Sequence, residues 1–368
     1  MNEEVFYHLA LTQVPQIGNI QIGVLLKHFG DPSLVFKSNR KLLESINGIG
    51  AIRADAIKKF SDFNRIEKEL KFISKNDISV LIKYDEGYPR RLENCVDAPQ
   101  LLFYKGSQSL NQQRIVAIVG TRAPTDYGKE RVAALIASLK SVDVMVVSGL
   151  AYGIDTLVHR DCVKYGINTV GVLGHGLDQI YPSSNRILAS EMLQQGGLLT
   201  EFMHGTKPDR QNFPKRNRIV AGMVDAVVVI ESGEKGGSII TAEIANSYNR
   251  DVFAYPGRTT DLGSMGCNHL IRTHRADLIT SGLEFIEFMG WNHATKKKKA
   301  IQAELFLSLE GTEKQLYNLI LDREPVSIDE LIVQTMLKSS EVSAILFSLE
   351  MRGLVSPRPG KLYAAVYR

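Results

Sequence analysis

Four clusters of small residues in the middle of the chain have the composition of phosphate-binding loops. Each follows an apolar run and is rich in glycine: Gly120-Thr121-Arg122, SGLAYGID at 148–155, GHGLD at 174–178 and GGSIITA at 236–242. Glycine lets the backbone approach a ligand closely, and free N–H groups at a helix start donate to anionic oxygens. Together the four clusters predict one phosphate-binding site.

A basic segment in the same region adds positive charge. Three cations, Lys215, Arg216 and Arg218, lie within four residues, and an apolar-periodic helix begins at Ile219. Guanidinium and ammonium groups form charge-assisted hydrogen bonds with phosphate oxygens. With Arg122, these three side chains are expected to surround the glycine loops.

The loops lack the residues of the common nucleotide-binding enzymes. The chain has no GxxxxGK[ST] loop for nucleotide hydrolysis and no GxGxxG with a following acidic residue for a nicotinamide cofactor. Asp155 and His159 are spaced i and i+4, but no third metal ligand is near, and an Asp at a helix start is more often an N-cap. We therefore expect neither cofactor nor metal, and interpret the region as a binder of a nucleic-acid backbone.

A sheet must position these loops. Short apolar runs alternate with helical patterns such as 129–140 and 156–165, which is typical of a parallel, doubly wound sheet with ligands at the carboxyl ends of its strands. We therefore expect an α/β, extended Rossmann-like domain over residues 66–290. Its predicted strands are Ser79–Ile82, Ile115–Val119, Val144–Ser148, Thr169–Leu173, Leu198–Glu201, Ala226–Ile230 and Val252–Ala254.

Residues 1–65 predict a helical helix-hairpin-helix/SAM-like domain. In Val14–Gly18 and Ile46–Gly50, glycine-containing turns precede apolar-periodic helices. Such a hairpin offers N–H groups to a phosphate, but few basic residues lie beside either turn. Phosphate binding and a plain packing or interaction module both stay open for this domain.

Residues 311–368 predict a winged-helix domain, which follows a lysine-rich linker at 291–310. The predicted helices and strands are 314–321, 327–333, 340–352, 354–356 and 362–365. The third helix of such a domain ordinarily enters a DNA groove, but here it has two acidic residues and no base before Arg352. We expect protein contacts instead, or an accessory contact through Arg358 and Lys361 of the wing.

Composition permits a nucleic-acid partner without requiring one. The net charge is +4 and the isoelectric point is near 8.8. The longest apolar runs have strand length, so no bilayer span is expected, and Met1–Glu4 lacks the basic region of a secretion signal. The three cysteines are far apart with no CxxC pair, which fits a reducing compartment. We expect a cytoplasmic protein with no membrane association.

Seven motifs occur in the order of a known family. They are Gly120-Thr121-Arg122, SGLAYGID (148–155), GVLGHGLDQIYPSSN (171–185), NFPKRNRIVAG (212–222), GGSIITA (236–242), YPG (255–257) and GCNHLI (266–271). In this order they resemble the bacterial DNA-processing protein DprA (Smf) family over the whole middle region. The resemblance implies a non-enzymatic homodimer that binds single-stranded DNA, protects incoming DNA during natural transformation and loads RecA recombinase.

The resemblance also implies roles for individual residues. Those implied in DNA binding are Gly120, Thr121, Arg122, Gly149, Asn185, Arg186, Lys215, Arg216, Arg218, Gly237, Ser238 and Thr241. Those implied in the dimer interface are Asn268, Ile271 and Leu278. Position 152, often arginine in the family, is Tyr152 here, which either stacks on a base for roughly 1–3 kcal/mol or packs over its loop.

An enzymatic alternative uses the same sheet. GGSIITAE (236–243) is similar to nucleotide phosphoribohydrolases of the lysine-decarboxylase-like family, in which a helix after a PGGxGT loop carries a catalytic glutamate. Glu243 is the candidate for that role. The chain lacks the PGGxGT sequence, and such an enzyme does not account for the domains at both ends, so we prefer the DNA-binding interpretation.

Overall fold

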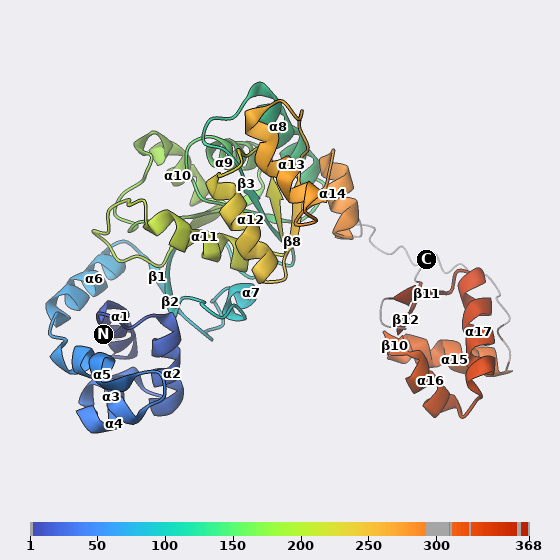
Figure 1. Cartoon of the computed structure of the whole chain (residues 1–368), viewed down its shortest axis with the longest axis horizontal. Coiled ribbons are helices and arrows are strands. Elements are labelled where there is room, and N and C mark those ends of the chain that lie inside the picture. The colour runs from blue at the N-terminus through green and yellow to red at the C-terminus, as the bar shows by residue number, and fades with distance from the viewer. Residues whose placement is uncertain (1–2, 292–308, 310, 324, 359–361, 367–368) are drawn as a thin grey trace. The chain divides into compact units, whose positions relative to one another are not determined.

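The computed structural model divides into two compact units, residues 1–295 and residues 296–368. The first contains a helical region and a large sheet, and the second a small winged-helix unit (Figure 1). None of the helices in the described part of the chain has the length and apolar character needed to cross a bilayer. The described residues are 3–291, 309, 311–323, 325–358 and 362–366.

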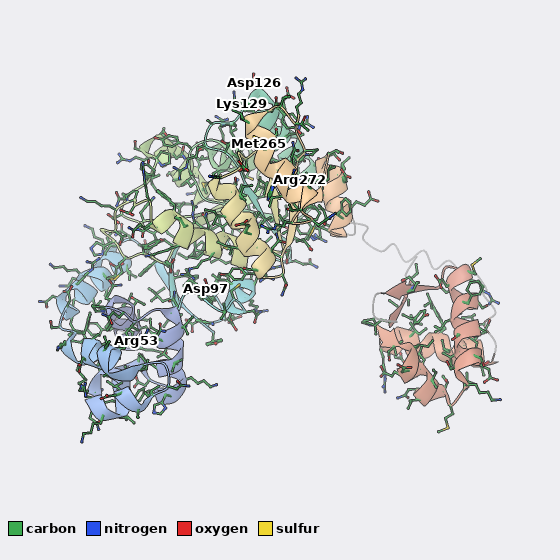
Figure 2. The ribbon with its side chains drawn as sticks, viewed as in Figure 1. Arg53, Asp97, Asp126, Lys129, Met265 and Arg272 are labelled. Carbon is green, nitrogen blue, oxygen red and sulfur yellow. The ribbon has the colours of Figure 1, made fainter. Side chains whose placement is uncertain are left out.

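Helices joined by tight turns form the N-terminal region. They are α1 (Glu3–Gln13), α2 (Asn19–Phe29), α3 (Pro32–Lys37), α4 (Arg40–Ser45), α5 (Gly50–Lys59) and α6 (Phe63–Lys75). Both predicted hairpin turns are present, with positive φ at Gln16 in the first and at Gly48 and Gly50 in the second. Arg53 joins the two turns by donating to the carbonyls of Gln16 (3.1 Å) and Gly48 (3.0 Å) (Figure 2).

The boundary predicted at residue 65 falls inside α6. The apolar side of this helix, including Ile66 and Ile73, shares a core with Leu101 and Phe103 of the sheet. Its buried Glu69 accepts hydrogen bonds from the backbone N–H and the ring of His204. The helical region is therefore packed onto the sheet and belongs to the same unit.

The sheet runs in the order β1-β2-β6-β5-β4-β3-β7-β8-β9. Its strands are β1 (Ser79–Ile82), β2 (Leu101–Gly106), β3 (Ile115–Val119), β4 (Met145–Ser148), β5 (Asn168–Val172), β6 (Gly196–Thr200), β7 (Ala226–Val229), β8 (Asp251–Ala254) and β9 (Asp277–Leu278). The seven predicted strands are confirmed within a few residues at each end. From β6 to β9 all pairings are parallel, and the order in which successive strands are added reverses between β3 and β7.

The expectation of a parallel sheet is wrong at one edge, where β1 and the unpredicted β2 pair antiparallel. A parallel connection needs a crossover of about a dozen or more residues, usually helical. Residues 83–100 connect these two strands, and their one helix, α7 (Arg90–Glu93), has four residues, too few for a helical crossover. The segment therefore returns antiparallel beside β6.

Alternating side chains of the central strands form two cores, one on each face. Ile115 and Ala117 face the core that holds α11, α12 and α13, while Val116 and Ile118 face α8, α9 and α14. The period-2 alternation of β3 thus produces a three-layered α/β domain. Its longer helices are α8 (Asp126–Leu139), α9 (Ile154–Tyr165), α10 (Arg186–Met192), α11 (Asn212–Gly222), α12 (Gly237–Ser247), α13 (Met265–Arg272) and α14 (Gly282–Phe288).

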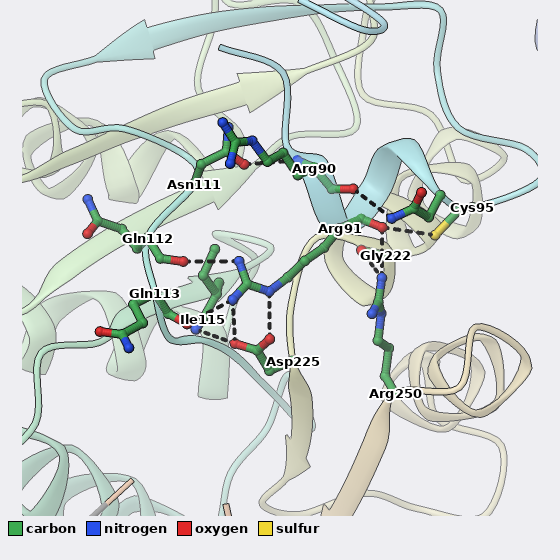
Figure 3. Close-up of polar contacts among 11 residues, drawn as sticks. Arg90, Arg91, Cys95, Asn111, Gln112, Gln113, Ile115, Gly222, Asp225 and Arg250 are labelled. Atoms are coloured by element: carbon green, nitrogen blue, oxygen red, sulfur yellow. Dashed lines mark hydrogen bonds and ion pairs between the residues drawn. The ribbon is translucent and has the colours of Figure 1, made fainter. Parts of the chain in front are cut away.

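A polar network fixes α7 against the amino ends of two central strands (Figure 3). Arg91 makes two hydrogen bonds to the carboxylate of Asp225 (2.6 and 2.9 Å) and also donates to the carbonyls of Gln112 and Gln113. Asp225 in turn accepts from the N–H of Ile115 at 2.8 Å. Planar two-point pairing of this kind sets both distance and orientation. The network anchors the end of the sheet opposite to the glycine loops.

The second unit has the element order predicted for a winged helix. It contains α15 (Gly311–Asp322), β10 (Val326–Ser327), α16 (Ile328–Thr335), α17 (Ser339–Met351), β11 (Val355–Arg358) and β12 (Leu362–Ala365). β12 pairs with both β10 and β11. Lys361, the side chain of Arg358 and most of the predicted linker lie outside the described residues.

Candidate nucleic-acid interface

A pocket of about 670 Å³ opens where the strand order reverses, at the carboxyl ends of β3, β4 and β7. This is the position at which open α/β sheets bind ligands. Eight of the twelve residues predicted to bind DNA line it: Gly120, Thr121, Arg122, Gly149, Arg216, Gly237, Ser238 and Thr241. We call this pocket, with these eight residues, the cradle.

The loop after β3 carries the first part of the cradle. The Thr121 N–H donates to the Glu231 carbonyl at 2.7 Å, and the Thr121 hydroxyl accepts from the Ala123 N–H at 3.2 Å. Arg122 is exposed, with its guanidinium 5.2 Å from the centroid of the Phe213 ring. The loop is tied back to the sheet while its arginine stays available to a ligand.

The loop after β4 needs glycine for steric reasons. Gly153 has φ 79°, and a Cβ there would lie 2.3 Å from the Thr121 carbonyl oxygen. A Cβ on Gly149 would lie 2.0 Å from Nη1 of Arg216. The space beside this loop is therefore filled by an arginine side chain from another element.

Arg216 forms the floor of the cradle and is 4% exposed. It donates from Nη1 to the carbonyl of Val172, and its charge faces Asp155. Burial lowers the pKa of Arg216 and raises the pKa of Asp155, and the opposite charge of the partner opposes each shift. A buried charge requires a compensating partner. Asp155 thus compensates Arg216, and it also accepts from the Ala151 N–H at 3.3 Å.

The third part of the cradle is the start of α12. Its N-cap is Gly236, which provides no side-chain hydrogen bond to the helix. Ser238 donates to Ser232 at 2.7 Å, and Ser232 donates to the Gly233 carbonyl at 3.0 Å, so the hydroxyls are ordered along the loop. The first residues of this helix, Gly237 and Ser238, line the pocket, and N–H groups at a helix start suit an anion.

Aromatic side chains border the cradle. Tyr152 and Tyr181 meet edge to face at 6.2 Å between ring centroids, and Tyr181 lies 6.1 Å from Phe213. Tyr152 is 48% exposed and Tyr181 is 42% exposed. Our sequence reasoning singled out Tyr152 but missed Tyr181 and Phe213. Their only signal was aromatic character within glycine-rich and basic loops.

Four predicted residues do not line the cradle. Asn185 is buried and donates to the Leu150 carbonyl (3.0 Å) and the Thr156 hydroxyl (2.8 Å), so it supports the loop from beneath. Arg186 is exposed at the start of α10. Lys215 and Arg218 lie on the other side of α11, because residues three apart share one helix face while Arg216 points to the opposite one.

The structure also adds polar residues to the cradle that sequence reasoning missed. Arg210 and Asn217 line it beside the predicted cations. Arg210 is exposed, and Asn217 donates to the Gly237 carbonyl at 3.4 Å. Arg210 lies outside the motif that carried the predicted cations, and the phase of α11 could not be read from its basic segment alone.

The position of Glu243 argues against its role as the catalytic residue of the enzymatic alternative. Glu243 does not line the cradle; it lies on an exposed face of α12 and pairs with Arg275 at 3.0 Å. Gly236 and Gly237, at the start of the same helix, do line the pocket. The helix therefore directs its first turn, and not this glutamate, toward a ligand.

The residues implied in a dimer interface differ in exposure. Asn268 exchanges two hydrogen bonds with the backbone of Gly257 in its own chain (3.1 and 3.0 Å). Ile271 is partly buried against the core, whereas Leu278 is 41% exposed on the edge strand β9. Of the three, Leu278 offers the most surface to a second chain.

Comparisons with known proteins agree on one family. Residues 79–290 match the family described as DNA recombination-mediator protein A, and residues 303–361 match the DprA winged helix domain. Protein Smf of Synechocystis is 33% identical over 399 residues, covering 98% of this chain and 99% of that protein. The DNA processing protein DprA of Streptococcus pneumoniae is 42% identical over 202 residues, covering 55% of this chain and 71% of that protein.

Two solved structures share the fold. The X-ray structure of DprA from Streptococcus pneumoniae matches with a TM-score of 0.66 at 33% identity, covering 77% of this chain and 97% of that one. DNA processing protein A from Helicobacter pylori, studied for its single-stranded DNA binding mode, matches with a TM-score of 0.53 at 30% identity, covering 59% and 97%.

Proposed function

The chain belongs to the DNA recombination-mediator protein A family, and on that premise we propose that it binds single-stranded DNA in the cradle and passes the strand to a recombinase. The observation that carries the proposal is the convergence of an open helix start, ordered hydroxyls and arginines at one sheet edge. This combination suits phosphate oxygens.

The aromatic border supports a single strand over a duplex. Bases of a single strand are free to stack on aromatic rings, and such stacking tolerates any base. Tyr152 and Tyr181 are exposed beside the phosphate-binding loops. The phosphates therefore supply affinity, the rings hold unpaired bases, and binding is tolerant of sequence.

We further propose the partners and the cellular location of the chain. The chain acts as a homodimer that loads RecA recombinase in natural transformation, and it has no enzymatic activity of its own. The free, buried cysteines Cys95, Cys162 and Cys267 fit a reducing, cytoplasmic location. The winged-helix unit serves protein contacts, because the exposed side of α17 carries Glu341, Phe347 and no basic residue before Arg352.

The test is fluorescence anisotropy of a labelled oligo-dT over a salt series. Arg122→Ala is expected to weaken binding by roughly 1.5–3 kcal/mol, the range for hydrogen bonds to charged groups. It should also make the salt dependence shallower, since each neutralised phosphate contributes a slope of about −0.7. Lys164→Ala, which removes an exposed charge of α9 away from the cradle, is the control. Equal affinity and slope for Arg122→Ala and wild type would reject the cradle as the binding site.

A further inference from the structure

Helix α11 presents polar residues to two different pockets. Phe213, Arg216 and Asn217 face the cradle, while Lys215 and Arg218 line a second cavity of about 440 Å³. The helix thus forms a wall between the two. An α-helix is about 10–12 Å across with its side chains, so a single strand of a few nucleotides can reach from one pocket to the other.

The second cavity joins two parts of the first unit. One side is the first hairpin with the start of α2, including Gln13 and Gly18, and the other is the segment after β6, including Glu201 and Thr206. The α2 helix, of 11 residues, begins at this cavity with Gly18 as its N-cap. Few basic residues lie beside its hairpin in the sequence. In the structure, Lys215 and Arg218 of α11 lie at the same cavity as the hairpin.

The charged groups of the second cavity are unequally satisfied. Arg218 donates to Glu201 and to the carbonyl of Asp97, so its charge is compensated within the fold. Lys215 is exposed and makes no hydrogen bond or ion pair with any described residue. Its positive charge acts on the Glu201 carboxylate of the same cavity, and its exposed ammonium group can also bind an anion.

Glu201 is the second unsatisfied group. Oε2 accepts from Arg218, but Oε1 is buried and has no hydrogen-bond partner among the described residues. A buried acceptor without a donor costs free energy comparable to a lost hydrogen bond. The amino group of a nucleobase is a donor of the kind that a carboxylate accepts, as in the pairing of glutamate with cytosine N4.

We propose that the second cavity binds a further nucleotide of the same single-stranded DNA. Its phosphate contacts Lys215 and the first turn of α2, and the donor edge of its base lies beside the Glu201 carboxylate, which lines the cavity. The inference rests on the proposed function, because it extends the strand that the cradle holds. It assigns the first hairpin a role in DNA binding, which its own sequence left undecided.

The test measures how affinity depends on DNA length. Labelled oligo-dC from about 4 to about 16 nucleotides, the range of known single-strand site sizes, is titrated by anisotropy against the full chain. Lys215→Ala removes the free charge, and Gln13→Trp fills the cavity from the hairpin side. Both are expected to leave the shortest oligomers unaffected and to weaken the longest about tenfold: Lys215→Ala by loss of a charged hydrogen bond, and Gln13→Trp by excluding the nucleotide from the cavity. Lys164→Ala is the control at every length.

Three outcomes separate the hypotheses. Loss of affinity at all lengths for Lys215→Ala would assign this lysine to the cradle and overturn the second site. Unchanged binding of the longest oligomers by both variants would overturn it too, provided that Arg122→Ala still weakens binding of the shortest. If Arg122→Ala is also without effect, the proposed function itself fails. Because Lys215 is exposed, its substitution keeps the test valid even if Gln13→Trp does not fold.

Discussion

Arg216 has a structural role as well as its place in the cradle. Its guanidinium is buried beside Asp155 and fills the space that the missing side chain of Gly149 leaves. Under the proposed function, a DNA phosphate above it would meet a cation whose position is already determined by the protein. Arg122, in contrast, is exposed and rests on the Phe213 ring. The two arginines therefore differ in what they lose on binding: Arg122 loses side-chain freedom, and Arg216 has little left to lose.

His159 lies next to this buried pair and makes stability depend on pH. Its Nδ1 is 2.7 Å from the Thr169 hydroxyl, and burial, with the charge of Arg216, lowers its pKa to about 3. The unfolded chain takes up a proton as pH falls below about 6.5, and the folded chain does not. The contribution of His159 to stability is therefore complete above pH of about 6.5 and is lost as pH falls toward 3.

We predict a flatter pH dependence of stability for His159→Gln. One group contributes a slope of at most about 1.4 kcal/mol per pH unit. Urea unfolding at pH 7 and pH 5 should show wild type losing up to roughly 2 kcal/mol more than the variant over this interval. His28→Gln, which removes an exposed imidazole, is the control. Parallel losses in wild type and His159→Gln would contradict the prediction.

Tyr152 tests the aromatic border of the cradle. If its exposed ring stacks on a base, Tyr152→Leu weakens oligo-dT binding by roughly 1–3 kcal/mol, while Tyr152→Phe retains affinity because it keeps the ring. Anisotropy titrations of the two variants measure the difference. Equal affinities for wild type, Leu and Phe would mean that the tyrosine only packs over its loop.

At the scale of elements, the cradle depends on contact between two loops. The Ile154 N–H donates to the Thr121 carbonyl at 3.1 Å, which joins the start of α9 to the loop after β3. The same carbonyl leaves no room for a side chain on Gly153. A change at one loop therefore moves the other, and with it Arg122.

We predict that Gly153→Ala lowers both stability and DNA affinity. Its positive φ and the short distance to the Thr121 carbonyl oppose a Cβ, so the free energy of unfolding falls by at least about 1 kcal/mol. Gly237→Ala is the control for unfolding, because a Cβ there meets no atom within 4 Å. Urea unfolding and oligo-dT titration measure the two effects. Unchanged affinity in a destabilised Gly153→Ala would show that the loops move independently.

At the scale of the whole molecule, both pockets lie within the first compact unit. Deletion of residues 300–368 is therefore expected to leave single-strand affinity and its salt dependence largely intact. The measurement is oligo-dT anisotropy of the truncated and full chains, with thermal unfolding to check that the first unit stays folded. A large loss of affinity by a folded truncation would give the winged-helix unit a part in binding.

The sequence by itself determined the local elements and the loops that meet at one pocket. Alternating apolar residues identified β3 and its neighbours, and glycine and hydroxyl residues after them identified the loops that line the cradle. Such signals are local, because strand period and turn chemistry act over a few residues. The strand β2 was missed although its residues Leu101–Tyr104 are apolar and aromatic. Its antiparallel direction could not be predicted locally, because it depends on the connection and on the edge available beside β6.

Only the tertiary structure determines which pocket each side chain of these elements faces. Lys215, Arg216 and Arg218 lie within four residues of the sequence. Arg216 nevertheless faces the cradle while the other two face the second cavity, because packing against the sheet sets the rotation of α11. The side chain of Asn185 points inward, where it donates a hydrogen bond to the Leu150 carbonyl in the loop after β4. Contacts between residues far apart in the chain determine such orientations, so a local sequence pattern cannot predict the orientations.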